Sequence, residues 1–97
     1  MTKAYTIVTY RSVSDPAALA AYAVLAGPAI EKAGGRLLAR GTAVKTFEAG
    51  IKERVVVIEF DGVGQAVAAY ESEAYRKALA VLGTGAERDI RIIEGAG

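Results

Sequence analysis

The run Val55-Val56-Val57-Ile58 limits the possible folds most strongly, because it is apolar at every position. Its β-branched residues predict a strand, which extends over 53–60. Successive side chains of a strand point to opposite faces, so Val55 and Val57 share one face while Val56 lies on the other. An antiparallel sheet with one face in water would alternate apolar and polar residues here. The strand is therefore expected to be covered on both faces.

The other segments place this strand in a β-α-β-β-α-β order. The expected strands cover 5–10, 36–48, 53–60 and 88–93, with a turn at 49–52; helices are expected from Pro16 to Gly34, over 63–70 and from Ser72 to Gly83. This order is the split βαβ arrangement of ferredoxin-like folds. It is an α+β class in which the helices cover one face of a four-stranded antiparallel sheet.

Local signals mark the ends of the helices. Asp15 can cap the first helix, and Pro16 fits its first position, where the missing backbone N–H has no partner to lose. Gly27-Pro28 falls inside this helix, so a kink or a break is expected there. Gly34-Gly35 is expected to end it. Ser72 is a good cap for the last helix.

The length and the apolar content together indicate self-association. The 97 residues are enough for one domain over 1–97, which buries only about 60–65% of its unfolded surface. Yet 53% of the residues are apolar, above the usual level of about 45–50%. A second copy packed sheet against sheet would cover the face that the helices leave open. We therefore expect a homodimer.

Composition excludes several classes of function. The 12 basic and 11 acidic residues form no basic stripe, so nucleic acid is not expected as a partner. The absence of histidine and cysteine disfavours a metal site, and no nucleotide-binding loop stands out, so no cofactor is expected. No signal peptide or membrane-spanning run is recognisable, which predicts a cytoplasmic protein without a membrane partner.

Arg40 is the first candidate for a ligand-binding site. It stands between Ala39 and Gly41 in an otherwise small-residue strand. With a turn at 49–52, antiparallel pairing would bring Arg40 close to Glu59, which makes Glu59 a second candidate for this site. Such an arginine can hold a carboxylate or enolate oxygen through two hydrogen bonds. The alternative is that Arg40 forms only a structural ion pair with Glu59.

Three hydroxyl groups complete the set of candidate ligand-binding residues. Ser72 and Tyr75 can present hydroxyls to a molecule held between helix and sheet, and a tyrosine can polarise a carbonyl or donate a proton. Tyr22 precedes the Gly27-Pro28 interruption by about one turn. The alternatives are that Ser72 is a helix cap and that both tyrosines are core residues. No catalytic residue can be named from the sequence.

Several motifs, in order, resemble a small bacterial family catalogued as domain of unknown function 1330. The motifs that carry the resemblance are Gly27-Pro28-Ala29-Ile30, Gly34-Gly35-Arg36-Leu37-Leu38-Ala39-Arg40-Gly41, Val57-Ile58-Glu59-Phe60, Ser72-Glu73-Ala74-Tyr75, Glu87-Arg88-Asp89 and Glu94-Gly95. The family is similar to the dimeric α/β-barrel superfamily, in which two ferredoxin-like subunits pack their sheets into a barrel. The resemblance thus implies the same fold and the same homodimer as the residue patterns.

The resemblance leaves the activity open. The superfamily includes cofactor-free monooxygenases, polyketide cyclases, lactone isomerases and haem-handling proteins. It implies a cofactor-free enzyme of monooxygenase, isomerase or cyclase type that acts on a small organic molecule. The alternatives are a non-catalytic small-molecule-binding or stress-associated dimeric module, and a purely structural dimer. Members commonly carry an arginine where this chain has Leu82, and an aromatic residue and a histidine where it has Ala69 and Glu71, which favours the binding module.

Overall fold

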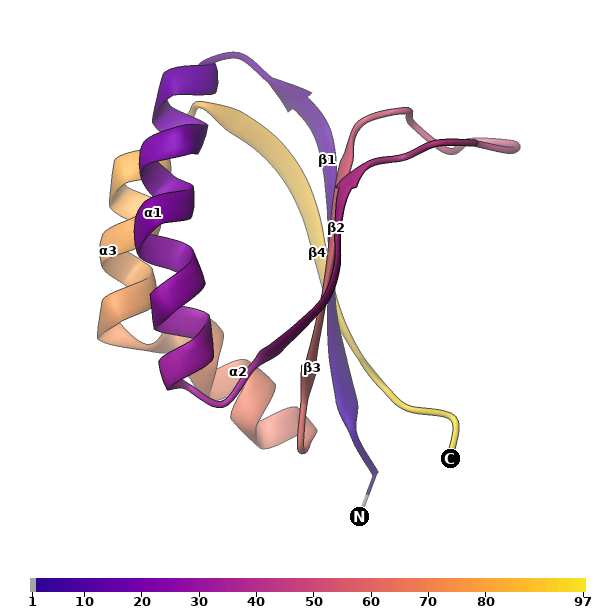
Figure 1. Ribbon diagram of the computed structural model, residues 1–97, viewed down its shortest axis with the longest axis vertical. Coiled ribbons are helices and arrows are strands. Elements are labelled where there is room, and N and C mark those ends of the chain that lie inside the picture. The colour runs from indigo at the N-terminus through magenta and orange to yellow at the C-terminus, as the bar shows by residue number, and fades with distance from the viewer. Residues whose placement is uncertain (1) are drawn as a thin grey trace.

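Four antiparallel strands form one sheet in the order β2-β3-β1-β4, with the helices along one of its faces (Figure 1). The computed structural model describes residues 2–97. The elements are β1 (Ala4–Val13), α1 (Pro16–Lys32), β2 (Arg36–Thr42), β3 (Arg54–Phe60), α2 (Val63–Glu71), α3 (Glu73–Leu82) and β4 (Ala86–Glu94). The expected α+β, ferredoxin-like fold is confirmed, and its second helical layer consists of two helices that meet at Ser72.

Helix α1 begins as the sequence predicts but is not broken in its interior. The Asp15 side chain accepts a hydrogen bond from the backbone N–H of Ala18, and Pro16 takes the first helical position. Of the kink or break expected at Gly27-Pro28, the break does not occur, because the helix continues through Pro28 to Lys32. Pro28 cannot donate to the carbonyl of Val24, so the helix lacks one internal hydrogen bond at this point without ending there.

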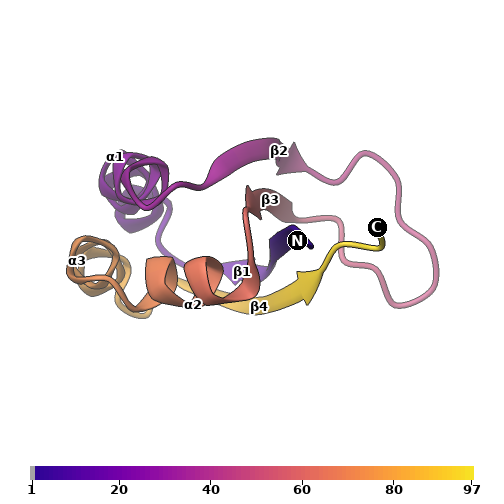
Figure 2. The same ribbon diagram turned by 90° about the horizontal axis from the view of Figure 1, so that it is seen from below.

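The connection between β2 and β3 is longer than predicted. The strand expected to reach Glu48 ends at Thr42, and residues 43–53 form a loop that extends beyond the sheet (Figure 2). Within this loop one backbone hydrogen bond, from Ala43 to Glu53, continues the pairing of the two strands. Val44 and Phe47 are 91% and 75% exposed, so neither side chain anchors the segment as a strand. The predicted turn at 49–52 is therefore only part of a wider loop.

The register decides which side chains face the helices. Thr6 lies opposite Ile58 and Val8 opposite Val56, so these residues share the helix-facing side of the sheet. Val55 and Val57 consequently lie on the other side, together with Ile7. No element of residues 2–97 covers that second side, which we call the open face.

Two small cores hold the helices in place. Tyr22, Ala26, Ala29, Tyr75, Ala78 and Leu82 pack α1 against α3. Ala4, Ile58, Phe60, Ala66 and Ala69 pack α2 against the sheet. The alanines in both cores allow the packed elements to approach closely. Helices α1 and α3 pack mainly against each other and less against the sheet. None of the helices among residues 2–97 has the length and the apolar character that a membrane crossing requires.

Candidate functional site

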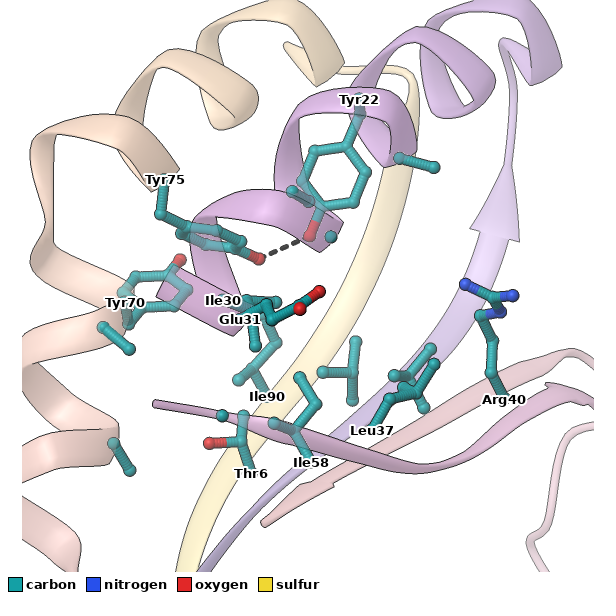
Figure 3. Close-up of a pocket in the computed structure, with 18 of the residues that line it drawn as sticks. Thr6, Tyr22, Ile30, Glu31, Leu37, Arg40, Ile58, Tyr70, Tyr75 and Ile90 are labelled. Carbon is teal, nitrogen blue, oxygen red and sulfur yellow. Dashed lines mark hydrogen bonds between the residues drawn. The ribbon is translucent and has the colours of Figure 1, made fainter. Parts of the chain in front are cut away.

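A pocket of about 540 Å³ lies between the helices and the helix-facing side of the sheet (Figure 3). Its floor is formed by alternate residues of the strands, and its roof by α1 and the α2–α3 pair. Most of its wall is apolar; the main contributors are Val8, Leu19, Leu37, Val56, Ile58 and Ile90. A volume of this size is typical of small-molecule sites, which fall at about 300–1,000 Å³.

The polar part of the pocket wall is a group of three hydrogen-bonded side chains from the helices and from β4. Tyr22 of α1 and Tyr75 of α3 have their hydroxyl oxygens 2.5 Å apart, and their rings meet edge to face. Arg88 of β4 donates from Nη1 to the Tyr22 hydroxyl at 2.9 Å. Both tyrosines are buried, with 7% and 4% of their surface exposed. Three separate elements thus bring their polar groups to one wall of the pocket.

Burial determines the charge state of Tyr22 in this hydrogen-bonded group. Burial, together with the neighbouring Tyr75 hydroxyl, raises the pKa of Tyr22, and the Arg88 guanidinium opposes this effect only in part. Tyr22 therefore keeps its proton at neutral pH. Since its oxygen accepts from Arg88, its own O–H is free to donate to Tyr75 or to a ligand. The hydrogen-bonded group can donate hydrogen bonds to an oxygen that becomes negative, but Tyr22 does not supply a base.

Arg88 is held by aromatic rings rather than by a carboxylate. Its guanidinium carbon lies 4.9 Å from the ring centre of Tyr22 and 5.5 Å from that of Tyr10. Cation–π contacts of this kind stabilise an arginine by about 0.5–2 kcal/mol. Within the described part of the chain, no carboxylate lies within 4.0 Å of Arg88. Its charge is therefore available to a bound molecule.

Two buried polar atoms without a hydrogen-bond partner belong to residues of the same pocket. Among residues 2–97 they are the only such side-chain atoms: Oγ1 of Thr6 and Nε of Arg54. Buried polar groups are nearly always paired, because an unpaired one costs about 1–3 kcal/mol. A ligand or ordered water in the pocket would supply the missing partners.

The structure places three of the five predicted ligand-binding residues on the pocket wall: Tyr22, Arg40 and Tyr75. Figure 3 shows Arg40 extending from β2 on the side of the pocket opposite Tyr75. Ser72 instead caps α3, accepting from the backbone N–H of Tyr75 at 3.3 Å and donating to the Ala69 carbonyl at 2.8 Å. Its hydroxyl is thus already used within the backbone of the α2–α3 junction.

The expected pairing of Arg40 with Glu59 is wrong. The register sets Arg40 opposite Val56 and Arg36 opposite Glu59, because the loop begins at Ala43 and β2 has an irregularity between Leu37 and Ala39. Glu59 lies on the open face, outside the pocket, and accepts hydrogen bonds at 2.9 Å from Arg36 and at 2.9 Å from Tyr5. The hydrogen bond from Arg36 has the largest effect and the one from Tyr5 adds to it; both lower the pKa of the Glu59 carboxyl.

A model of one protein family matches residues 3–96, nearly the whole chain. That family is described as Domain of unknown function (DUF1330). The chain belongs to this family. The resemblance noted in the sequence is thus confirmed. No curated protein matches the chain.

Solved structures with low sequence identity share the fold. A protein of unknown function from Rhodopseudomonas palustris matches at a TM-score of 0.75 and 17% identity, over 99% of this chain and 84% of that one. A dimeric ferredoxin-like protein of unknown function from Thermobifida fusca matches at 0.59 and 18%, over 97% and 92%. SnoaB, a cofactor-independent oxygenase from Streptomyces nogalater, matches at 0.60 and 9%, over 99% and 93%.

Three residues of the pocket that were not predicted, Arg88, Arg54 and Thr6, can be recognised from the alternation along their strands. Arg88 has the same parity as Ile90 and Ile92, and Arg54 has the same parity as Val56 and Ile58. A polar residue in phase with the core positions of a strand is directed at the core side. Thr6, between Ala4 and Val8, follows the same rule.

Glu31 has no comparable signal, because it lies on an exposed part of α1. Figure 3 shows that its carboxylate points into the pocket below the Tyr22 hydroxyl. It is the single carboxylate among the described residues that line the pocket. No group of three or more histidine, cysteine or acidic residues suited to a metal occurs within residues 2–97.

Proposed function

We propose that this protein binds a small organic molecule in the pocket and acts on it without a cofactor. The observation that supports this most directly is the hydrogen-bonded group formed by Tyr22, Tyr75 and Arg88 at the edge of an apolar cavity. Hydroxyl and guanidinium donors held in fixed positions stabilise an oxygen that gains negative charge, and they act most strongly where water is excluded. An enolate or phenolate oxygen meets this description.

Glu31 is the group that would take the proton. Its carboxylate points into the same cavity and is the one acidic group on the pocket wall among the described residues. Removal of a proton from the carbon next to a carbonyl leaves an enolate, and delivery of that proton to a different atom of the anion completes an isomerisation. Cyclases and cofactor-free oxygenases begin from the same anion. The fold shared with the cofactor-independent oxygenase SnoaB supports this class of reaction by analogy.

Exchange of carbon-bound hydrogen tests this proposal. We expect the protein to accelerate hydrogen–deuterium exchange at the α-carbon of phenylacetone in heavy water, followed by NMR against the uncatalysed rate. Glu31→Gln should abolish the acceleration, and Tyr22→Phe should reduce it by about a hundred- to a thousandfold, the range for one oxyanion donor. Tyr5→Phe removes a hydroxyl on the open face and should have no effect on exchange. Equal rates with and without protein would count against catalysis on such ketones.

The non-catalytic binding module is the second candidate, and the exposure of Glu31 favours it. No hydrogen bond to another described residue orients the Glu31 carboxylate. A general base is normally held in place by such a partner. Binding of phenylacetone, detected by a shift of the melting temperature, without any exchange would select this candidate over the enzyme.

We further propose that the protein is a homodimer that associates through the open face. Val55 and Val57 lie half-buried there beside Ile7, and Ile93 is 59% exposed. Apolar residues on a solvated face favour contact with another copy. The fold shared with the Thermobifida fusca protein, which is described as dimeric, is consistent with this arrangement. The expected cytoplasmic location is retained as part of this proposal.

The proposed chemistry uses only side chains of the protein. We therefore expect the purified protein to carry no metal, flavin or haem. An absorption spectrum between the near ultraviolet and the red, together with elemental analysis, checks this expectation. A visible band, or one equivalent of metal per chain that survives dialysis, would contradict it.

A further inference from the structure

We propose that the molecule bound in this pocket is an organic acid, with its carboxylate between Arg40 and Arg54 and its apolar body along the floor. This inference rests on the proposed function and names the class of its ligand. It is carried by the distribution of arginines over the two sides of the sheet.

The register gathers arginines at one end of the pocket floor. Arg54 pairs with Thr42, one step along the same side of the sheet from the pair of Arg40 and Val56. On the far side of β1, Arg88 pairs with Tyr10. All three arginines line the pocket. Arg40 and Arg54 therefore lie on adjacent strands, where they can hold a carboxylate, whereas Arg88 reaches the hydroxyl of Tyr22. The floor beyond these two arginines is apolar.

Arginines that reach the open face form ion pairs, whereas these three form none with the part of the chain that the structure describes. Arg11 and Arg91 contact Asp89, and Arg36 contacts Glu59 and Asp61 at the pocket rim. Arg40, Arg54 and Arg88 have no carboxylate within 4.0 Å among residues 2–97.

The Nε atom of Arg54 is in addition buried without a hydrogen bond. Guanidinium groups bind carboxylates through two parallel hydrogen bonds, so a carboxylate in the pocket supplies the missing acceptor.

The charge of the pocket wall agrees with an anionic ligand. Four arginines and one glutamate line it, and within residues 2–97 only Arg36 among these arginines is neutralised by a carboxylate. Arg54 and Arg88 are half-buried, so their charges are costly without a partner, whereas Arg40 is exposed to solvent. The empty pocket is thus left with an excess of positive charge. A neutral ligand of the same shape would leave this excess in place.

The position of the tyrosines fixes the other end of the ligand. Figure 3 shows Tyr22 and Tyr75 on one side of the cavity and Arg40 on the other. An acid with a phenol or carbonyl oxygen away from its carboxylate can satisfy both ends. The apolar side chains between them, Val56 and Ile58, would contact its ring.

Two matched pairs of compounds test the inference by calorimetric titration. One is para-hydroxybenzoate with para-hydroxybenzamide, and the other is phenylpyruvate with phenylacetone. We expect each acid to bind at least tenfold more tightly than its neutral partner. Arg54→Gln and Arg40→Gln should each weaken the acids by about ten- to a hundredfold, the usual effect of one charged hydrogen bond, and leave the neutral compounds unchanged. Arg91→Gln, three residues from Arg88 but on the open face, is the control and should leave all four unchanged.

The outcomes separate this inference from the proposed function. Equal binding of acids and neutral partners, or acids insensitive to both arginine variants, overturns the acid ligand while the pocket remains a binding site. Binding of all four compounds that is insensitive to Tyr22→Phe overturns the assignment of the tyrosine end, and with it the proposed function.

A measurement without ligand decides the inference even when all four compounds bind too weakly to detect. Since Arg54 is an unpaired, half-buried cation, Arg54→Gln should raise the melting temperature of the empty protein. Arg91→Gln breaks an ion pair with Asp89 and should leave the temperature unchanged or lower it slightly. A lower melting temperature for Arg54→Gln than for Arg91→Gln would show that Arg54 is a structural residue and overturn the inference.

Discussion

Tyr22 shows how one side chain serves both the core and the site. Its ring packs between α1 and α3, and its hydroxyl accepts from Arg88 and meets the hydroxyl of Tyr75. Burying a hydroxyl is tolerable only because these partners are present. Removing the hydroxyl would leave Arg88 and Tyr75 each short of a partner. The residue is therefore fixed by packing and by hydrogen bonding at the same time.

The raised pKa of Tyr22 predicts a loss of stability in alkali. The unfolded chain releases the tyrosine proton near its ordinary pKa of about 10, whereas the folded protein holds the proton to higher pH. The contribution is thus complete below pH 10 and is lost as the pH rises above it, because only the unfolded state gains the tyrosinate. Urea unfolding of wild type and Tyr22→Phe between pH 8 and 11 measures this. The free energy of unfolding of wild type should fall more steeply than that of the variant; parallel curves would contradict the prediction.

The corner between α1 and β2 determines how the first helix approaches the sheet. Gly34 has a φ of +93°, a conformation that side chains rarely adopt. A Cβ atom on Gly35 would lie 2.5 Å from Ile30 and 3.0 Å from both Ile58 and Phe60. The two glycines therefore end the helix and let β2 begin directly against the core. This close corner positions the edge of the pocket.

Gly35→Ala should destabilise the protein by about 1–3 kcal/mol, the usual effect of overpacking a core. Gly64→Ala is the matched control, because its Cβ would meet nothing within 4 Å. Gly64 is helical, so alanine there should stabilise the protein by about 0.5–1 kcal/mol. Chemical denaturation of the three proteins compares the free energies of unfolding. A Gly35→Ala variant as stable as wild type would show that the corner can relax at no cost.

The whole molecule consists of a sheet and a helical layer, and one face of the sheet is left uncovered. Its principal extents are 38 × 34 × 16 Å; the view down the shortest axis shows the helices along one side of the sheet only (Figure 1). The open face combines half-buried valines with ion pairs such as Arg36 with Glu59. The loop of residues 43–53 extends beyond the sheet (Figure 2) and exposes Val44 and Phe47. Both features are those of a surface that a second copy would cover.

Val57→Lys should dissociate the proposed dimer, because it places an unpaired charge in the centre of the interface. Val24→Lys is the control, since Val24 is 72% exposed on α1, in the helical layer and away from the open face of the sheet. Native mass spectrometry at micromolar concentration should show dimers for wild type and Val24→Lys, and monomers or unfolded chains for Val57→Lys. A wild-type protein that is monomeric under these conditions would refute the dimer.

The sequence by itself determined the elements and most of the faces. Strand alternation assigns Val56 to one side of β3 and Val57 to the other, and the structure confirms this division. The prediction that Asp15 and Ser72 cap helices is also confirmed. Each of these features depends on neighbours a few residues away, so a local pattern is sufficient to reveal it.

Only the tertiary structure decided which side chains meet. Tyr75 and Arg88 reach Tyr22 from 53 and 66 residues away. The partner of Glu59 depends on where the loop after β2 begins and on the irregularity near Leu37, and neither leaves a clear trace in the composition of the strand. Contacts between distant segments follow from how whole elements pack. The sequence could therefore propose Tyr22 and Tyr75 separately, but their contact with each other and with Arg88 required the packed structure.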